Sequence, residues 1–491
     1  MSTFGRYVVA IVLGTSLLAP AGASQSSTIL DCDALPGLTP DVWQGLGVDP
    51  DADDQWENDA NWSLGIAPVR LSDPYVCIPA GGTPVIGAGQ EAQLVALDVA
   101  ADAELTVDAG GKLFLYGGTL TPSTIRGRVE VIGATIGGPG RVDVSGTLQL
   151  RSLGASGPVT ITTRECALFA GPYRPGEERC VPGLPIIGAT GRIVVDDDGV
   201  IDVSGGRVNL ADEFELTVHG LVRVHDDGFL AADHGTRVEL LPRSAATPGT
   251  GTLRFEDDGD YVEGSNDSGI AEMGTVVNQG LIIKSGGNGT TLLTGAYSQP
   301  APGAVTVGSG TLLLPSGSPT PASVAAGAGY GSGRCLTPDP GCLEQTFGVD
   351  RQNVQFHVPS EDITGASVLI RELSTTSSAL DIGYPVEAHA TGLSATAEAP
   401  AILSLRYDER ILNGRDWSSI NVFRRASDGA PYVALQPCLP NGDQPEGQVA
   451  CVDRRGLAGS SRNVVDAEGP GSSPDVIMVV RTVGTSRWVA R

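Results

Sequence analysis

The chain has 491 residues, with 67 glycines, 33 prolines, 41% hydrophobic residues and 5% aromatic residues. So many glycines exclude a helical bundle, and so many hydrophobic residues exclude a disordered chain, so we expect short strands joined by tight turns. The formal net charge of −26 excludes nucleic acid and anionic membrane surfaces as partners.

Residues 1–23 have the pattern of a secretory signal peptide. Arg6 forms a short basic region, YVVAIVLGTSLLA is an apolar core, and AGAS provides a small-residue cleavage site near Ala23. The apolar core is shorter than a typical membrane span, although an uncleaved anchor is the alternative. We therefore expect a secreted or cell-surface protein without a membrane span in the mature chain.

The cysteine content agrees with export, because an even number of cysteines in an exported chain predicts disulfides. The eight cysteines are Cys32, Cys77, Cys166, Cys180, Cys335, Cys342, Cys438 and Cys451. The simplest connectivity pairs them as neighbours along the chain, but the sequence leaves the pairing open. A metal site is a weaker interpretation, since no C-x-x-C spacing occurs.

Residues 24–74 are expected to form an acidic leader and an N-terminal cap. Carboxylates alternate in its second half as in a calcium-binding loop, at Asp49, Asp51 and Asp53. However, Asp54 replaces the glycine and Ala60 replaces the bidentate glutamate of such a loop. A solvated acidic segment is therefore the default interpretation, and Ca²⁺ is the one cofactor that we consider.

Residues 75–317 repeat one sequence pattern. Two apolar residues, separated by one other residue, precede a glycine-containing turn. ELTVDAGGKLFLYGG is an example, and DVSG occurs at both 143–146 and 202–205. The glycines leave no helical periodicity. An antiparallel barrel or sandwich is the alternative, but uniformly short strands and similar turns favour a right-handed parallel β-helix, or solenoid.

A solenoid must cover its open ends, because the terminal coil exposes apolar interior and unpaired backbone. Trp56 and Trp62 precede the first repeat strands. We expect both rings to be buried against the first coil and to act as capping residues. In the alternative, both rings stand in solvent along a groove that binds sugars.

The stretch WENDANWSLGIAP…DPYVCIP resembles the lead-in to the glycine-rich β-solenoid repeats of bacterial exported proteins, including autotransporter-like passenger regions. The residues that carry the resemblance are Trp56, Asn61, Trp62, Ser63, Gly65, Pro68, Asp73, Val76 and Ile78. The segment 276–317 resembles later repeats of the same proteins. The resemblance implies export and a surface, adhesive or carrier role, and it implies no reaction.

Residues 318–349 are rich in glycine, proline and serine and are expected to form a linker, with GAGYGSG at 327–333 inside it. Longer strand-like segments separated by polar turns follow from 350 to 491. They predict a C-terminal antiparallel β-sandwich.

Three Asp-Asp-Gly turns are the candidates for chemistry. Their acids are Asp197, Asp198, Asp226, Asp227, Asp257 and Asp258, spaced about 30 residues apart. If each spacing is one coil or a little more, we expect the acids to lie near one another on one face, where they suit Ca²⁺ binding or a carboxylate pair for glycoside hydrolysis. The simpler interpretation is turn chemistry, with glycine adopting positive φ.

Histidines near these turns are also candidates. His219, His225 and His234 lie close in sequence and suit a metal cluster, although surface histidines are the simpler interpretation. The nucleophile and nucleotide motifs G-x-S-x-G, H-E-x-x-H and the P-loop do not occur.

The expected function is therefore a non-enzymatic surface module that binds carbohydrate or protein. The alternative is a β-helical polysaccharide-degrading enzyme that uses the Asp-Asp turns.

Overall fold

A computed structural model describes most of the chain from residue 40 onward. The described residues are 40–45, 54–69, 75–117, 121–153, 159–162, 191–211, 214–232, 236–242, 251–257, 261–263, 274–293, 296–315, 320–335, 351–362, 365–373, 382–407, 412, 415–427, 429–441, 443–457, 476–483 and 486–491. The predicted signal peptide lies outside them. Within these ranges, no helix has the length and apolar character needed to span a membrane.

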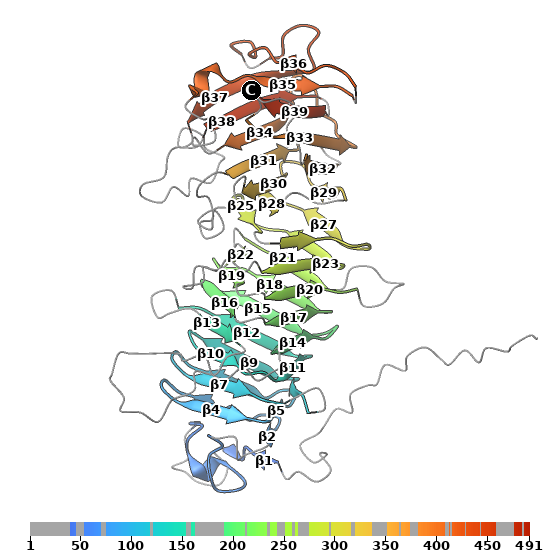
Figure 1. The fold of residues 1–491 in the computed structure, drawn as a ribbon. Helices are drawn as coiled ribbons and strands as arrows, with labels where there is room; N and C mark the ends of the chain where they lie inside the picture. Colours follow the sequence, from blue (N-terminus) through green and yellow to red (C-terminus); the bar gives the residue numbers. More distant parts are fainter. Residues whose placement is uncertain are drawn as a thin grey trace, which may run out of the picture.

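Strands dominate the described residues, accompanied by two single-turn 3₁₀ helices, η2 (Asp59–Asn61) and η5 (Trp417–Ser419). Three parallel sheets wind around one core and form the predicted solenoid (Figure 1). Each coil runs from sheet 1 to sheet 2 and then to sheet 3.

The strands of each sheet stack coil upon coil in the order given. Sheet 1 contains β1 (Asp41–Val42), β2 (Tyr75–Ile78), β5 (Ala96–Val99), β8 (Ser123–Ile125), β11 (Arg141–Val144), β14 (Arg192–Val195), β17 (Glu215–Val218), β20 (Arg237–Leu240), β23 (Thr275–Asn278) and β26 (Ala296–Ser298). Sheet 2 begins with β3 (Val85–Ile86), β6 (Glu104–Val107), β9 (Arg128–Ile132), β12 (Thr147–Arg151), β15 (Val200–Ser204), β18 (Leu221–Val224), β21 (Thr252–Phe255), β24 (Leu281–Lys284), β27 (Ala304–Val307) and β29 (Ala322–Val324). Sheet 3 contains β4 (Glu91–Leu94), β7 (Lys112–Leu115), β10 (Thr135–Gly137), β13 (Val159–Thr162), β16 (Arg207–Ala211), β19 (Phe229–Ala232) and β22 (Tyr261–Glu263).

The alternation seen in the sequence forms the core. In β14, Ile193 and Val195 point inward and are buried, and they stand in register with Leu216 and Val218 of β17. The same pairing continues from coil to coil, so the apolar side chains form continuous interior columns.

A fourth sheet replaces sheet 3 near the end of the solenoid. Sheet 4 begins with the parallel strands β25 (Thr290–Leu292), β28 (Thr311–Pro315) and β30 (Gly329–Cys335). It continues with the antiparallel strands β31 (Arg351–His357), β34 (Ala401–Tyr407), β38 (Val476–Thr482) and β37 (Ala450–Leu457).

Sheet 2 also changes from parallel to antiparallel pairing. Beyond β29 it continues with β32 (Ala366–Glu372), β33 (Ile382–Thr391), β39 (Ser486–Ala490), β35 (Val422–Arg425) and β36 (Val433–Ala434). The C-terminal strands are therefore extensions of two solenoid sheets.

The linker prediction for 318–349 was wrong for its described part, 320–335. GAGYGSG lies in β30 and in the turn that precedes it, β29 comes just before that turn, and Tyr330 is buried in the core. Its glycines serve close packing, since a Cβ on Gly331 would lie 2.0 Å from the carbonyl oxygen of Val354 on β31. Glycine enrichment marked tight strand contact here, which the sequence pattern does not distinguish from a flexible link.

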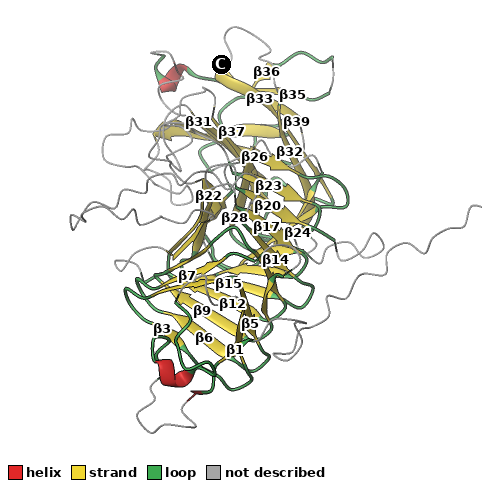
Figure 2. Cartoon of the chain, turned by 60° about the horizontal axis from the view of Figure 1, so that its bottom comes forward, coloured by secondary structure: helices red, strands yellow, loops and turns green. Residues whose placement is uncertain are grey.

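The N-terminal residues close the first coil, as Figure 2 shows at the η2 end of the molecule. Trp56 and Trp62 are 0% and 2% exposed, as the capping prediction requires. The two rings meet edge to face at 4.6 Å, and Trp43 packs on Trp62 at 5.1 Å. The indole N–H of Trp56 donates to the carbonyl of Pro68, and that of Trp62 donates to the carbonyl of Trp56.

Candidate functional site

The three Asp-Asp-Gly turns do not lie on one face. Asp197 and Asp198 follow β14, at the corner between sheets 1 and 2. Asp226, Asp227 and Asp257 follow β18 and β21, at the corner that leaves sheet 2. The expectation that all three turns share one face was wrong, because the first interval is one coil plus one strand and so ends at a different corner. Asp258 lies outside the described residues.

The second and third turns do come together. The backbone N–H of Asp227 donates to Oδ2 of Asp257 at 2.8 Å, which joins adjacent coils. Asp226 and Asp227 both adopt positive φ, at 51° and 59°. The prediction that glycine takes the positive φ was therefore wrong for this turn.

Glycine is required in these turns for a different reason, namely space. A Cβ on Gly228 would lie 2.7 Å from the carbonyl oxygen of Val203 in the coil below. A Cβ on Gly199 would lie 2.0 Å from the carbonyl oxygen of Val144. Close approach to the coil below therefore explains the glycines at both corners.

His225 connects the strand below to its own turn. Its Nε2 lies 2.7 Å from Oδ1 of Asp202 on β15, and its Nδ1 lies 2.8 Å from Oδ2 of Asp226. Arg223 donates to both oxygens of Asp202, at 2.9 and 3.0 Å. Both ring nitrogens of His225 therefore face carboxylate oxygens, one on the strand below and one in its own turn. Sequence reasoning missed Asp202 and Arg223, whose outward positions on adjacent strands were the available signal.

The Asp202 carboxylate gives a pH-dependent prediction. Burial alone raises its pKa, but the hydrogen bonds and charges of Arg223 and His225 outweigh burial and hold the pKa below the ordinary value of 3.8. A lowered folded-state pKa stabilises the fold above the unfolded-state pKa, and this contribution is lost as the pH falls through the folded-state value. We expect Asp202→Asn to lower the free energy of unfolding at pH 7 by about 1–3 kcal/mol.

Urea unfolding at pH 7 and at a series of acidic values measures this effect. The difference from the wild type should shrink below pH 3.8 as Asp202 becomes protonated in the wild type. Asp198→Asn is the matched control, because Asp198 is exposed, and we expect a change within about 0.5 kcal/mol. A difference for Asp202→Asn that stays constant with pH contradicts the assigned charge interaction.

The two described histidines of the candidate cluster, His219 and His225, do not lie together as a metal cluster requires. His219 lies at the corner between sheets 1 and 2, whereas His225 lies at the corner leaving sheet 2, and His234 is outside the described residues. Near His219, partial desolvation and then the charge of Asp143 raise the pKa of Asp196, although its side chain reaches solvent. Among the described residues, no group of three or more His, Cys, Asp or Glu side chains is arranged to hold a metal. Asp49, Asp51 and Asp53, the calcium candidates, lie outside those residues.

Lys284 is a buried charge at the same corner, and sequence reasoning gave it no role. Its side chain on β24 is 0% exposed and points into the solenoid. The ammonium Nζ donates to the carbonyl oxygens of Asp257 at 2.6 Å and Gly286 at 3.0 Å. Lys284 therefore stabilises two successive turns by satisfying backbone acceptors that face the interior.

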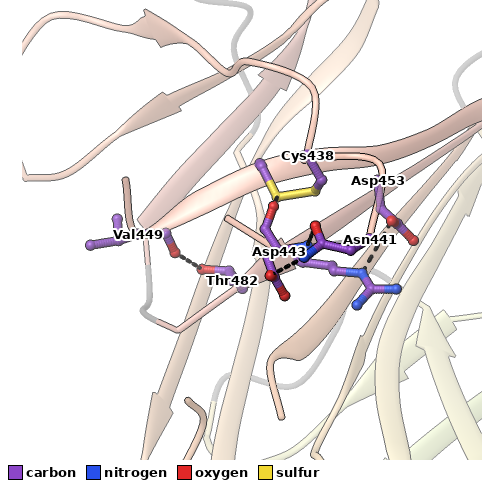
Figure 3. Close-up of a disulfide and its surroundings, with 8 residues drawn as sticks. Cys438, Asn441, Asp443, Val449, Asp453 and Thr482 are labelled. Atoms are coloured by element: carbon purple, nitrogen blue, oxygen red, sulfur yellow. Dashed lines mark hydrogen bonds and ion pairs between the residues drawn. A yellow bond between two sulfur atoms is a disulfide. The ribbon is translucent and has the colours of Figure 1, made fainter. Parts of the chain in front are cut away.

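The described cysteines agree in part with the simplest pairing. Cys438 and Cys451 form a disulfide that closes the loop before β37 (Figure 3). Within that loop, the N–H of Leu439 donates to the carbonyl of Asp443. Cys77 is buried and disulfide-bonded, and its predicted partner Cys32 lies outside the described residues. The predicted pairs Cys166–Cys180 and Cys335–Cys342 cannot be placed within them.

The outer side of sheet 2 carries a charged face, which we define by Glu104, Arg128, Glu130, Asp202, Arg223 and Arg254. These residues lie in two columns of register partners, with the uncharged Thr147 and Gln149 of β12 between β9 and β15, and they alternate with the buried apolar positions. Arg128 pairs with Glu104 at 3.2 Å and with Glu130 at 3.3 Å, and its side chain is 44% exposed. The charged face therefore combines ordered geometry with access to solvent.

Sheet 2 continues this arrangement in its antiparallel part. There Glu387 on β33 pairs with Arg487 at 3.2 Å and His389 at 3.0 Å. Polar groups held at strand spacing along one sheet can hydrogen-bond an extended partner, which makes this surface the candidate functional site.

Comparison of the chain with protein-family models, with curated proteins and with solved structures gives no match.

Proposed function

We propose that this chain is an exported, non-enzymatic rod that presents the charged face of sheet 2 to carbohydrate or protein ligands at the cell surface or after release. The observation that carries the proposal is the ordered row of partly exposed ion pairs along the longest sheet. The resemblance of residues 55–317 to bacterial exported β-solenoid proteins supports the same role. The acidic overall charge favours ligands other than polyanions.

We further infer that the antiparallel ends of sheets 2 and 4 pack as a β-sandwich. Residues Val354 and Phe356 of β31 and Val368 and Ile370 of β32 are buried in one apolar core, and β31 contacts both β32 and β33. Face-to-face sheets with alternating buried residues are the pattern of such a module.

Binding to an array of defined neutral and acidic glycans tests the carbohydrate form of the proposal. We expect Arg128→Ser to weaken binding about tenfold, which corresponds to about 1.4 kcal/mol, because Arg128 is exposed at the centre of two ion pairs. Arg237→Ser is the matched control on sheet 1. Arg237 is 45% exposed and pairs with Glu239 two residues ahead, as Arg128 pairs with Glu130. Equal loss in both variants, or no glycan bound, contradicts the carbohydrate form.

The enzyme alternative has a direct test. Acidic polysaccharides are incubated with the protein and with Asp197→Asn, Asp226→Asn and Asp257→Asn, and the release of new reducing or unsaturated ends is measured. We expect no release by any of the four proteins, since Asp197 lies at a different corner from Asp226 and Asp257, and the Asp257 carboxylate already accepts the backbone N–H of Asp227. Cleavage by the wild type that one of these substitutions abolishes overturns the non-enzymatic proposal.

A further inference from the structure

Exposed apolar side chains gather at the two ends of the rod. Among the described residues, the exposed large hydrophobic side chains are Leu64, Ile66, Val69, Leu153, Val433, Leu439 and Val449. We call Leu64, Ile66 and Val69 the N-pole, and Val433, Leu439 and Val449 the C-pole. Figures 1 and 2 place the cap that carries the N-pole and the β36 region that carries the C-pole at opposite ends. Leu153 alone lies on the side, after β12.

The N-pole is held rigidly in place. The Asp41 carboxylate accepts hydrogen bonds from the hydroxyl of Ser63 and from the backbone N–H of Leu64, each at 3.1 Å. Asp59 accepts from the N–H of Ala67 at 2.7 Å. Ile66, between these two anchors, is 65% exposed. A fixed loop that displays apolar side chains loses little conformational entropy when it binds.

The C-pole is also fixed. Val433 belongs to β36, which ends sheet 2, and it is 62% exposed. Leu439 follows Cys438 directly, and Val449 lies two residues before Cys451, so the disulfide holds both near the same edge. A short terminal strand with exposed apolar residues is a surface on which another chain can pack.

The charges beside the N-pole and beside Val433 have opposite sign, whereas Asp443 and Glu446 lie in the loop between Leu439 and Val449. The described residues of the cap, 40–45 and 54–69, include Asp41, Asp54, Glu57 and Asp59 and no Lys or Arg. At the C-pole, the guanidinium groups of Arg425 and Arg491 lie over the ring of Tyr432, at 5.7 and 5.0 Å, next to Val433. An acidic apolar end complements an apolar end with arginines, and two identical ends do not complement each other.

We propose that copies of this chain associate end to end, with the N-pole of one copy on the C-pole of the next. Because the two poles lie at opposite ends of the rod, such a heterologous contact does not close between two copies, so it builds an open filament. This inference concerns self-association and is independent of the ligand proposed for the charged face.

Sedimentation velocity over a range of protein concentrations tests the inference. The wild type should grow beyond a dimer as concentration rises, and added salt should weaken this growth. The N-pole variant Leu64→Ser with Ile66→Ser and the C-pole variant Val433→Ser with Leu439→Ser should each associate at least about tenfold more weakly. Leu153→Ser, which changes a side chain that is 42% exposed on the side of the rod, should behave as the wild type does.

Mixing the two pole variants separates this geometry from symmetric pairing. One variant retains an intact C-pole and the other an intact N-pole, so the mixture should form dimers and nothing larger. A wild type that stays monomeric at all concentrations overturns the proposal. Persistent dimers of either variant alone also overturn it, because they indicate contact between identical poles. Thermal unfolding of each variant, monitored by circular dichroism, should match the wild type, since all the changed side chains are exposed.

Discussion

Trp62→Ala is expected to lower the free energy of unfolding of the N-terminal coils by about 3–5 kcal/mol. The ring is 2% exposed and lies between Trp43 and Trp56, so its removal leaves a cavity at the centre of the cap. The indole donor to the carbonyl of Trp56 is lost as well. Because each coil is stabilised by its neighbours, loosening the cap exposes the first coil to unfolding.

Denaturant unfolding followed by tryptophan fluorescence measures the loss. In the Trp62→Ala variant, hydrogen exchange resolved by peptide should speed up relative to the wild type more in β2 and β3 than in β34 and β38. Leu64→Ala is the control within the same cap, because Leu64 is 54% exposed, and it should change stability by less than about 0.5 kcal/mol. Equal effects of the two substitutions would mean that the tryptophans do not close the solenoid.

Lys284→Met is expected to destabilise the protein by about 3 kcal/mol. Methionine preserves most of the side-chain volume but donates no hydrogen bond. The carbonyls of Asp257 and Gly286 then remain buried without the donor that they have in the wild type. Removing one partner of a buried polar contact costs more than replacing both, because the remaining groups stay desolvated.

The chain contains its own control for this experiment, since its only two lysines are Lys112 and Lys284. The Lys112 side chain is 44% exposed and lies 4.0 Å from Glu91, so Lys112→Met should change stability by less than about 0.5 kcal/mol. In the wild type, an amine-reactive reagent should modify Lys112 rapidly and Lys284 only on unfolding. Rapid modification of Lys284 under native conditions contradicts its buried placement.

Much of the solenoid was predictable from the sequence, because uniformly short strands with an apolar residue at every second position and similar glycine-containing turns favour stacked coils over an antiparallel barrel or sandwich. Strands such as β14 and β17 contain this alternation within four residues. The tryptophan cap was also predictable. Trp56 and Trp62 come just before the first repeat strands, where the open end of the first coil would otherwise expose its apolar core.

The arrangement of the acidic turns was not predictable, because coil lengths vary. Residues 147 and 200 are register partners on adjacent strands of sheet 2, and so are 200 and 221. A constant interval between Asp-Asp-Gly turns therefore does not report a constant place on the coil. The roles of Asp202 and Lys284 depend on neighbours from other coils, which no local pattern reveals.

The continuity of sheets 2 and 4 has a mechanical consequence. The strands cross the long axis of the molecule, so the backbone hydrogen bonds between coils run along that axis (Figure 1). A pulling force between the two ends therefore stretches every ladder along its hydrogen bonds. Because β29 and β30 pair with strands on both sides, the junction transmits tension through the same ladders instead of bending at a hinge. Under load, the parallel coils and the antiparallel C-terminal strands therefore extend as one stiff element.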